Sequence, residues 1–401
     1  FMIKTLDVKI YVGVILHTLG GMLTTSIENS VFLYLTYLGL LLFIWGLFKS
    51  DFCSPVAKKY IPSSYWFMMF IVLTMFLRYD SEGANAGQIQ THTGTIVSSF
   101  LFLVLLINPF SFRLNDIIKY CLILTGIAFV YSIIYWKDIV LAHAWLNNEG
   151  SIRLATMGQL SAFGMLSCSF LLCIQHILPK KIVYLSMAGL LFGLILMMVA
   201  GRRSYTFIYF LFISIAFYLY IKNNPTQKKF WRYVIVGALL AGMVLFFLSK
   251  QDTMFVFLLG RIEANTREGI EFYWAKDMAK DPFAWIWGKG ASGGYYDGDF
   301  GFVRGGIELG FQHIVLKGGL LMFIPYLWLH LYAAYLAYFK SRSKVMKGLS
   351  MYILVWTLNI YFKGVPSFLL VHLLVWISFG WIFNPRIRSM NDSQFKKLFL
   401  K

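Results

Sequence analysis

The sequence predicts an all-α, polytopic membrane protein that crosses the bilayer about twelve times, and three observations lead to that prediction. Of its 401 residues, 59% are hydrophobic and only 13% are charged, which is too few polar groups to cover a soluble chain of this size. Apolar stretches of about 20 residues, the length that spans roughly 30 Å of hydrocarbon as a helix, recur along nearly the whole chain. Lysine and arginine are concentrated in alternate connecting segments, which is typical of multi-spanning proteins.

The expected spans follow one another with short connections, apart from one long insertion. We place them near 8–26, 31–48, 64–79, 93–111, 115–136, 155–178, 182–200, 204–221, 231–249, 312–339, 348–363 and 366–384. The chain is therefore expected to form a single integral membrane domain over 1–401. The insertion at 250–311, between the ninth and tenth spans, is long enough to be a functional loop.

The distribution of charge predicts which side of the membrane each loop occupies. With an even number of spans both termini lie on one side, and the segments of that side carry 22 of the 36 Lys and Arg residues but only four of the 18 acidic residues. Cytoplasmic loops retain positive charge, so we expect both termini in the cytoplasm and the loop 250–311 outside it. Because the net charge of +18 is spread over short loops, it does not indicate binding to nucleic acid.

The four cysteines indicate neither a disulfide framework nor a metal site. They lie in a predicted cytoplasmic loop or inside spans and form no CxxC pair: Cys53, Cys121, Cys168 and Cys173.

The first half of the long loop predicts a helix on or near the membrane surface. Asn265 is a candidate N-cap with Glu268 three residues later, which is the spacing of a capping box. An apolar stripe follows at helical spacing, made of Ile270, Tyr273, Trp274, Ala275 and Met278.

The second half of the loop, residues 288–306, predicts irregular structure because it contains eight glycines among nineteen residues. Glycines allow the backbone to approach a bound ligand closely. Tyr295, Tyr296 and Phe300 offer flat faces on which a sugar ring can stack. The alternative is a loop that is merely flexible.

His313 is the histidine that we single out for chemistry. His17, His176, His330 and His372 are interpreted as packing residues at or within spans. His313 differs because it follows the loop, one helical turn before Lys317, on the side that also holds a group of arginines: Arg202, Arg203, Arg261, Arg267 and Arg304.

Arginines on the outer side of a helical bundle suit a lipid-linked substrate with a phosphate-rich head. The guanidinium group donates paired hydrogen bonds to phosphate oxygens and keeps its charge at any physiological pH. Arg202 and Arg203 stand between two apolar spans, and neighbouring residues of a helix point about 100° apart. We expect one of them to face inward, whereas the alternative is that both extend to lipid headgroups.

The order of these features resembles the O-antigen polymerase and O-antigen ligase superfamily, whose members are GT-C-type membrane glycosyltransferases. The family's Gly-x-Arg-Ser/Thr element after the seventh span is similar to Gly-Arg-Arg-Ser at 201–204, with Arg203 on its arginine. The family's large periplasmic loop has an arginine before an aromatic helix and then Gly-x-Gly, which is similar to Arg267, Tyr273-Trp274 and Gly288-Lys289-Gly290. His313 matches the histidine at the head of the following span.

The residues after this histidine distinguish the branches of the superfamily. Ligases commonly have a polar residue next and a glycine about ten positions later, whereas this chain has Ile314 and an early pair, Gly318 and Gly319. The stretch is similar to the polymerase-like members. The resemblance thus implies a polymerase that joins undecaprenyl-diphosphate-linked glycan repeat units on the periplasmic side of the bacterial inner membrane.

The resemblance also implies roles for particular residues. Arg203 and Arg267 would stabilise charge on the diphosphate, and His313 would accept the proton of the acceptor hydroxyl, with Glu308 and Glu271 as the alternative bases. Further substrate-binding residues would be Arg202, Arg261, Lys289, Tyr295, Tyr296, Arg304, Glu308 and Lys317. A single displacement would invert the configuration at the anomeric carbon. Because arginines would stabilise the diphosphate in place of a divalent ion, we expect no metal or other cofactor.

Expected partners are the lipid-linked glycan, membrane lipids and a chain-length regulator, but no nucleic acid. Two other functions remain open. One is an O-antigen ligase that transfers the polymer to lipid A core. The other is a flippase or transporter of lipid-linked glycans, a class in which internal repeats and charged or broken helices at the bilayer midplane are common.

Overall fold

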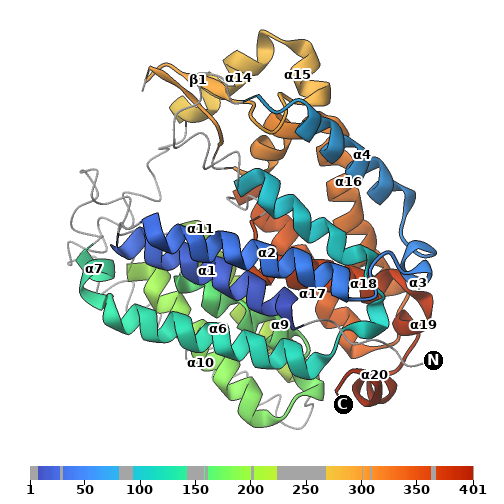
Figure 1. Ribbon diagram of the computed structural model, residues 1–401. Coiled ribbons are helices and arrows are strands. Elements are labelled where there is room, and N and C mark those ends of the chain that lie inside the picture. Colours follow the sequence, from blue (N-terminus) through green and yellow to red (C-terminus); the bar gives the residue numbers. More distant parts are fainter. Residues whose placement is uncertain are drawn as a thin grey trace.

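The chain is mostly helical in the computed structural model, which describes residues 8–27, 30–80, 94–141, 158, 161–199, 203–223, 268–299, 301–307, 309–362 and 367–400. Its longer helices are α1 (Lys9–Ile27), α2 (Leu33–Lys49), α4 (Ser63–Leu77), α6 (Leu114–Ile134), α10 (Lys180–Val199), α11 (Arg203–Asn223), α14 (Glu268–Ala279), α16 (Gly310–Phe339), α17 (Lys344–Phe362) and α18 (Leu370–Phe383). Shorter α-helices are α3 (Pro55–Lys58), α7 (Trp136–Leu141), α9 (Cys168–Cys173), α15 (Pro282–Trp287), α19 (Pro385–Arg388) and α20 (Asp392–Phe399). Figure 1 shows their arrangement.

The predicted class, an all-α membrane protein, agrees with this structure. Five of the described helices are long and apolar enough to cross a membrane, namely α1, α6, α10, α11 and α16, and shorter apolar helices include Gly94–Leu106 and Ser161–Cys173. Each predicted span on described residues coincides with a helix, and the ninth, 231–249, lies outside them. The total of twelve spans stays a prediction.

Two connections predicted to be cytoplasmic, those after α2 and before α17, meet the end of the fourth predicted span and the C-terminal tail respectively. The Asn108 amide donates to Asp51 over 2.8 Å, and the Ser341 hydroxyl donates to the Arg388 carbonyl over 2.8 Å. In Figure 1, α3, α19 and α20 lie at the lower right, away from α14 and α15 at the top. These segments therefore lie away from α14 and α15, and the sidedness of both ends stays a prediction.

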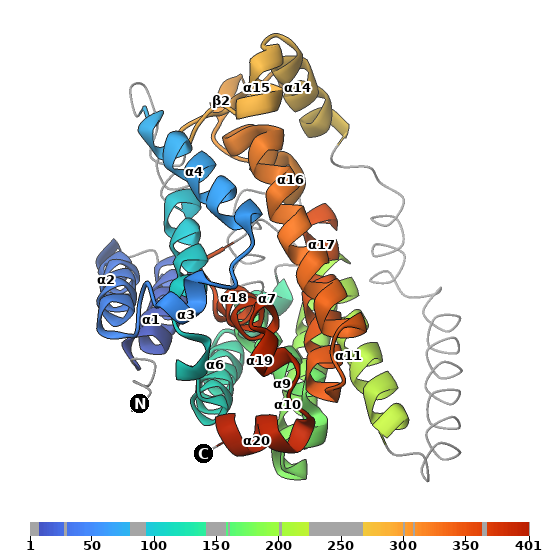
Figure 2. The same cartoon turned by 90° about the vertical axis from the view of Figure 1, so that its right-hand side faces the viewer.

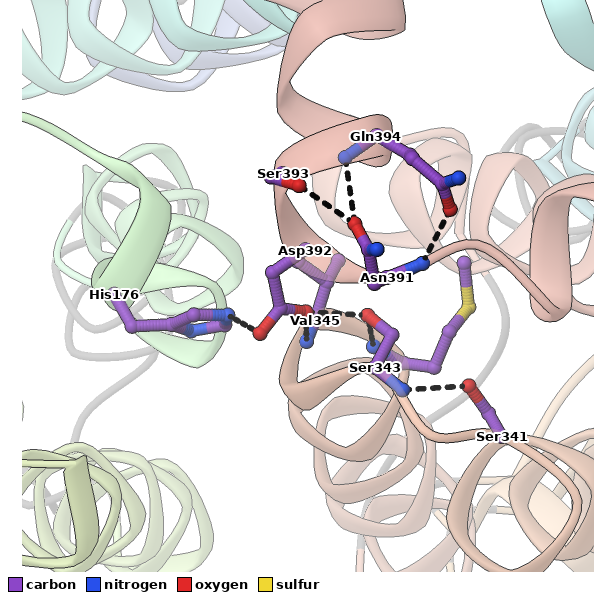
Figure 3. A network of polar contacts seen from close by, with 9 residues as sticks. His176, Ser341, Ser343, Val345, Asn391, Asp392, Ser393 and Gln394 are labelled. Carbon is purple, nitrogen blue, oxygen red and sulfur yellow. Dashed lines mark hydrogen bonds and ion pairs between the residues drawn. The ribbon is translucent and has the colours of Figure 1, made fainter.

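Asp392, at the start of α20, ties the tail to the bundle (Figure 3). Its carboxylate accepts from the Ser343 hydroxyl over 2.6 Å and from the Val345 amide over 3.2 Å, and it lies 3.4 Å from His176 Nε2. Partial burial acts to raise the pKa of this carboxyl, but His176 and the two hydrogen bonds outweigh it and hold the pKa well below its ordinary value. The bonded carboxylate therefore fixes the C-terminal helix to the ends of α16 and α17.

The described part of the long loop forms a folded cap at the N-terminal end of α16. We use "cap" for α14, α15 and a hairpin of β1 (Tyr295–Asp297) and β2 (Phe302–Arg304), followed by the start of α16 (Figure 2). Its small core contains Trp274, Met278, Ala284, Tyr295, Ile307, Val315 and Leu316. The predicted helix is confirmed as α14, although Ala275 of the expected stripe is exposed and Asn265 lies outside the described residues.

The prediction of irregular structure over 288–306 is wrong for the hairpin. Strands β1 and β2 pair antiparallel with Tyr295 opposite Arg304 and Asp297 opposite Phe302. Glycines between the strands supply the turn, where Gly301 has φ of 70°, and the residues of β1 alternate between buried and exposed. Each strand is only three residues long, so the high glycine content of the segment hides its strand pattern in the sequence.

Cysteine labelling tests the predicted sidedness. Cys53 is exposed in the loop after α2 and the other three cysteines are buried, while Ala279 is exposed at the end of α14. In cells with a permeabilised outer membrane, an impermeant maleimide should label Ala279→Cys in a Cys53→Ser background. The same reagent should reach Cys53 of the parent chain only after the inner membrane is opened. The reverse pattern would place the cap in the cytoplasm.

Candidate active site at the start of α16

The N-terminal part of α16 is broken at Gly319, and the cap attaches at this break. Gly319 has φ of 68° and ψ of −171°, which is not helical. Such a break frees backbone carbonyls that a continuous helix would satisfy. The carbonyls of Leu316 and Lys317 instead accept hydrogen bonds from the amides of Lys289 over 2.7 Å and Gly290 over 3.0 Å.

Glycines make this approach of two backbones possible. A Cβ on Gly319 would lie 2.0 Å from the Ile286 carbonyl oxygen, and one on Gly288, which has φ of 66°, would lie 2.4 Å from the Lys317 carbonyl oxygen. The Gly-x-Gly at 288–290 and the Gly pair at 318–319 are therefore the two halves of one joint between the cap and α16.

Two cationic side chains close the joint. Lys317 is 1% exposed, and its ammonium donates to the carbonyls of Ala291 over 2.9 Å and Gly293 over 2.7 Å. Arg78, at the end of α4, donates to the carbonyls of Trp287 over 2.7 Å and Gly288 over 2.9 Å. The two side chains therefore hold the cap against both α4 and α16. Lys317, which is expected to bind substrate, is bonded to backbone carbonyls of the cap.

His313 lies one turn before Lys317 on the same face of α16. Its side chain is buried, with 5% exposed, and Nε2 is 3.1 Å from the Thr95 hydroxyl oxygen at the start of the helix Gly94–Leu106. Nδ1 has no hydrogen-bond partner among the described residues. A neutral imidazole has one donor and one acceptor nitrogen, so when Nε2–H donates to Thr95, Nδ1 is left as an open acceptor.

Thr95 was not predicted as a site residue. It lies 218 positions before His313 and carries only a hydroxyl, so its sole sequence signal is its place at the outer end of the fourth predicted span. The buried Oε1 of Gln312 also has no hydrogen-bond partner within the described chain.

The other predicted substrate-binding residues of the cap have protein partners. Lys289 donates to Asp277 over 2.6 Å and to the Gly294 carbonyl over 3.3 Å. Arg304 Nε lies 3.0 Å from a carboxylate oxygen of the buried Asp297. Partial burial acts to raise the pKa of Asp277, but Lys289, together with Lys280, outweighs it and lowers that pKa below its ordinary value.

The two tyrosines expected to stack on sugar occupy different environments. Tyr295 is fully buried in the cap core, so its ring offers no free face in this conformation. Tyr296 is half-exposed on the opposite face of β1 and keeps an accessible ring.

Several predicted residues lie outside the described residues, namely Arg202, Arg261, Arg267, Phe300 and Glu308. Arg203 begins α11, where only its backbone is described, and Glu271, the other alternative base, lies on α14. Phe212 of α11 packs on Tyr352 and Trp356 of α17, whose Tyr361 stacks on Phe311 with ring centroids 5.8 Å apart. At the opposite end of α17, Val345 bonds to Asp392, which lies beside His176, and the neighbouring Gln175 bonds to the carbonyl of Ala216 in the second half of α11. The start of α11 therefore lies toward the end of α17 that meets Phe311, near His313.

Comparisons with protein-family models, with curated proteins and with solved structures found no match to this chain. Within the described residues, no group of three or more His, Cys, Asp or Glu side chains is arranged to hold a metal ion.

Proposed function

We propose that this chain is an O-antigen polymerase, a membrane glycosyltransferase that joins undecaprenyl-diphosphate-linked repeat units on the periplasmic side of the bacterial inner membrane. The observation that supports the proposal most is the buried Nδ1 of His313, which has no hydrogen-bond partner among the described residues while Nε2 of the same ring pairs with Thr95, one turn before the joint with the cap. A general base for a sugar hydroxyl needs an acceptor atom of this kind, held in a fixed direction.

The reaction needs little from the protein beyond positioning and charge. The hydroxyl oxygen of the acceptor unit attacks the anomeric carbon of the donor while the bond from that carbon to the diphosphate oxygen breaks. The hydroxyl proton passes to His313 Nδ1, and undecaprenyl diphosphate leaves with the electron pair. Arg203 and Arg267 are proposed to stabilise the charge that develops on the leaving group.

The polymerase branch is favoured over the ligase branch by the Gly pair after His313. Gly318 and Gly319 lie at the break of α16, where they receive the Gly-x-Gly segment of the cap. The feature that sets this sequence apart from the ligase pattern is thus part of the joint that holds the cap over His313.

Purified chain mixed with an undecaprenyl-diphosphate-linked repeat unit tests the proposal. A ladder of polymers should form with release of one undecaprenyl diphosphate per new bond, and it should persist in excess EDTA. Transfer only to lipid A core would identify a ligase, and translocation without new glycosidic bonds would identify a flippase. Either result would overturn the proposal.

The same assay separates the two adjacent arginines. Arg203→Lys keeps the charge but loses paired donation to phosphate, so we expect a strong fall in turnover at unchanged expression. Arg202→Lys, at the variable position of the motif, should have a milder effect. Equal tolerance at both positions would mean that neither binds the diphosphate and that both extend to lipid headgroups.

A further inference from the structure

Helix α15 of the cap carries an exposed face that is wholly apolar. Phe283 is 70% exposed, and Ile286 and Trp287, three and four positions later, are also exposed. This spacing puts the three side chains on one face of the helix. The other face is covered, because Ala284 is buried and Trp285 packs on Trp274 at 5.2 Å between ring centroids.

The exposed face of α14 differs in charge. It includes Lys276 and Ala279 beside Phe272, with Lys280 directly after the helix, as expected of a surface in contact with water. Two neighbouring helices of one cap therefore present surfaces suited to different surroundings.

The apolar face of α15 begins where the exposed stripe of α4 ends. On α4 that stripe consists of Trp66, Phe70, Leu73 and Leu77, the last 78% exposed. The next residue, Arg78, donates to the carbonyls of Trp287 and Gly288 at the end of α15. Helix α16, which packs beside α4, carries a comparable exposed stripe through Leu320, Ile324 and Trp328.

We propose that α15 is an interfacial anchor whose Phe283, Ile286 and Trp287 insert into the outer leaflet of the membrane that the protein spans. The occupant is lipid because the face is continuous with stripes on α4 and α16 that a spanning helix turns toward hydrocarbon. Arg78 donates to the backbone carbonyl of Trp287 at the end of α15, and tryptophan is enriched at the headgroup boundary.

The anchor fixes the height of the cap. Because α15 is joined to the break of α16 through Gly288–Gly290, inserting α15 at the headgroup boundary sets that joint, and His313 one and a half turns before the break, at a fixed depth. This inference depends on the fold and not on the proposed reaction.

Spin labels on the full-length chain in phosphatidylcholine–phosphatidylglycerol vesicles test the anchor. In a Cys53→Ser background, nitroxides are attached singly at Phe283→Cys and Ile286→Cys, with Ala279→Cys on α14 as the matched control. Collision with oxygen, which concentrates in hydrocarbon, is compared with collision with a water-soluble nickel chelate.

We expect both α15 labels to shift toward oxygen and the Ala279 label to shift toward nickel. Nickel dominance at 283 and 286 would place α15 in water and overturn the proposal. Low accessibility to both reagents would overturn it as well, because it would show a protein partner on this face. Using two α15 positions guards against one variant that fails to fold.

Discussion

Replacing His313 with alanine should abolish polymer formation while the chain still binds its lipid-linked donor. A positioned general base typically contributes about 10²–10⁴-fold to the rate, so turnover should fall by roughly this factor. The donor is expected to be held by arginines and by apolar surface, and neither changes in this variant. The measurements are the initial rate of bond formation and a separate binding assay with the undecaprenyl-diphosphate-linked unit.

His313→Gln distinguishes proton transfer from orientation. Glutamine keeps a donor for Thr95 but cannot accept a proton as imidazole does, so it should be nearly as inactive as alanine. Substantial turnover by this variant would show that His313 only orients the substrate, and the search for the base would move to Glu271 and Glu308.

Two further variants serve as controls for the His313 result. Thr95→Val removes the partner of Nε2, 3.1 Å away, and should lower turnover less than His313→Ala, because the base remains but is less well oriented. His176→Gln alters a histidine beside Asp392 in the C-terminal network and should leave turnover close to that of the parent. A loss of activity in His176→Gln as large as in His313→Ala would show a general folding defect.

The helices could be predicted from the sequence because their signal is one of composition. An apolar run long enough to span the bilayer is visible whatever it packs against, which is why each predicted span on described residues coincides with a helix. The stripe of α14 was predicted for a similar reason, since Trp274 and Met278 lie four positions apart and both face the cap core.

The joint between the cap and α16 could not be predicted, because it is built from backbone. Lys289 and Gly290 are joined to Leu316 and Lys317 by amide and carbonyl groups that every residue has. A glycine-rich sequence predicts that another group approaches the backbone closely, but it does not indicate whether that group is a ligand or another part of the chain. From the sequence alone, the glycines of the loop are therefore assigned to a ligand. Lys317 also bonds to backbone carbonyls, so its partners could not be predicted either. Lys289 and Arg304 pair with acidic side chains of the loop at sequence separations that follow no regular spacing.

Gly319→Ala should uncouple the cap from α16 and reduce transfer even though Gly319 carries no reactive group. The residue has φ of 68° and ψ of −171°, a region that is essentially restricted to glycine and that costs a residue with a Cβ roughly 1–3 kcal/mol. The new Cβ would also lie 2.0 Å from the Ile286 carbonyl oxygen, a contact that only movement of α15 or α16 can relieve. Such overpacking costs about 1–3 kcal/mol more, so the cap should detach more readily.

Gly301→Ala is the matched control, because Gly301 has φ of 70° in the hairpin turn but no heavy atom within 4 Å of the added Cβ. It carries the cost of a positive φ without the collision. Thermal unfolding and the rate of limited proteolysis within the cap should therefore change much more for Gly319→Ala than for Gly301→Ala, and turnover should follow the same order. Equal changes in the two variants would show that the joint yields to an added methyl group, and the cap would then not depend on close contact with the break in α16.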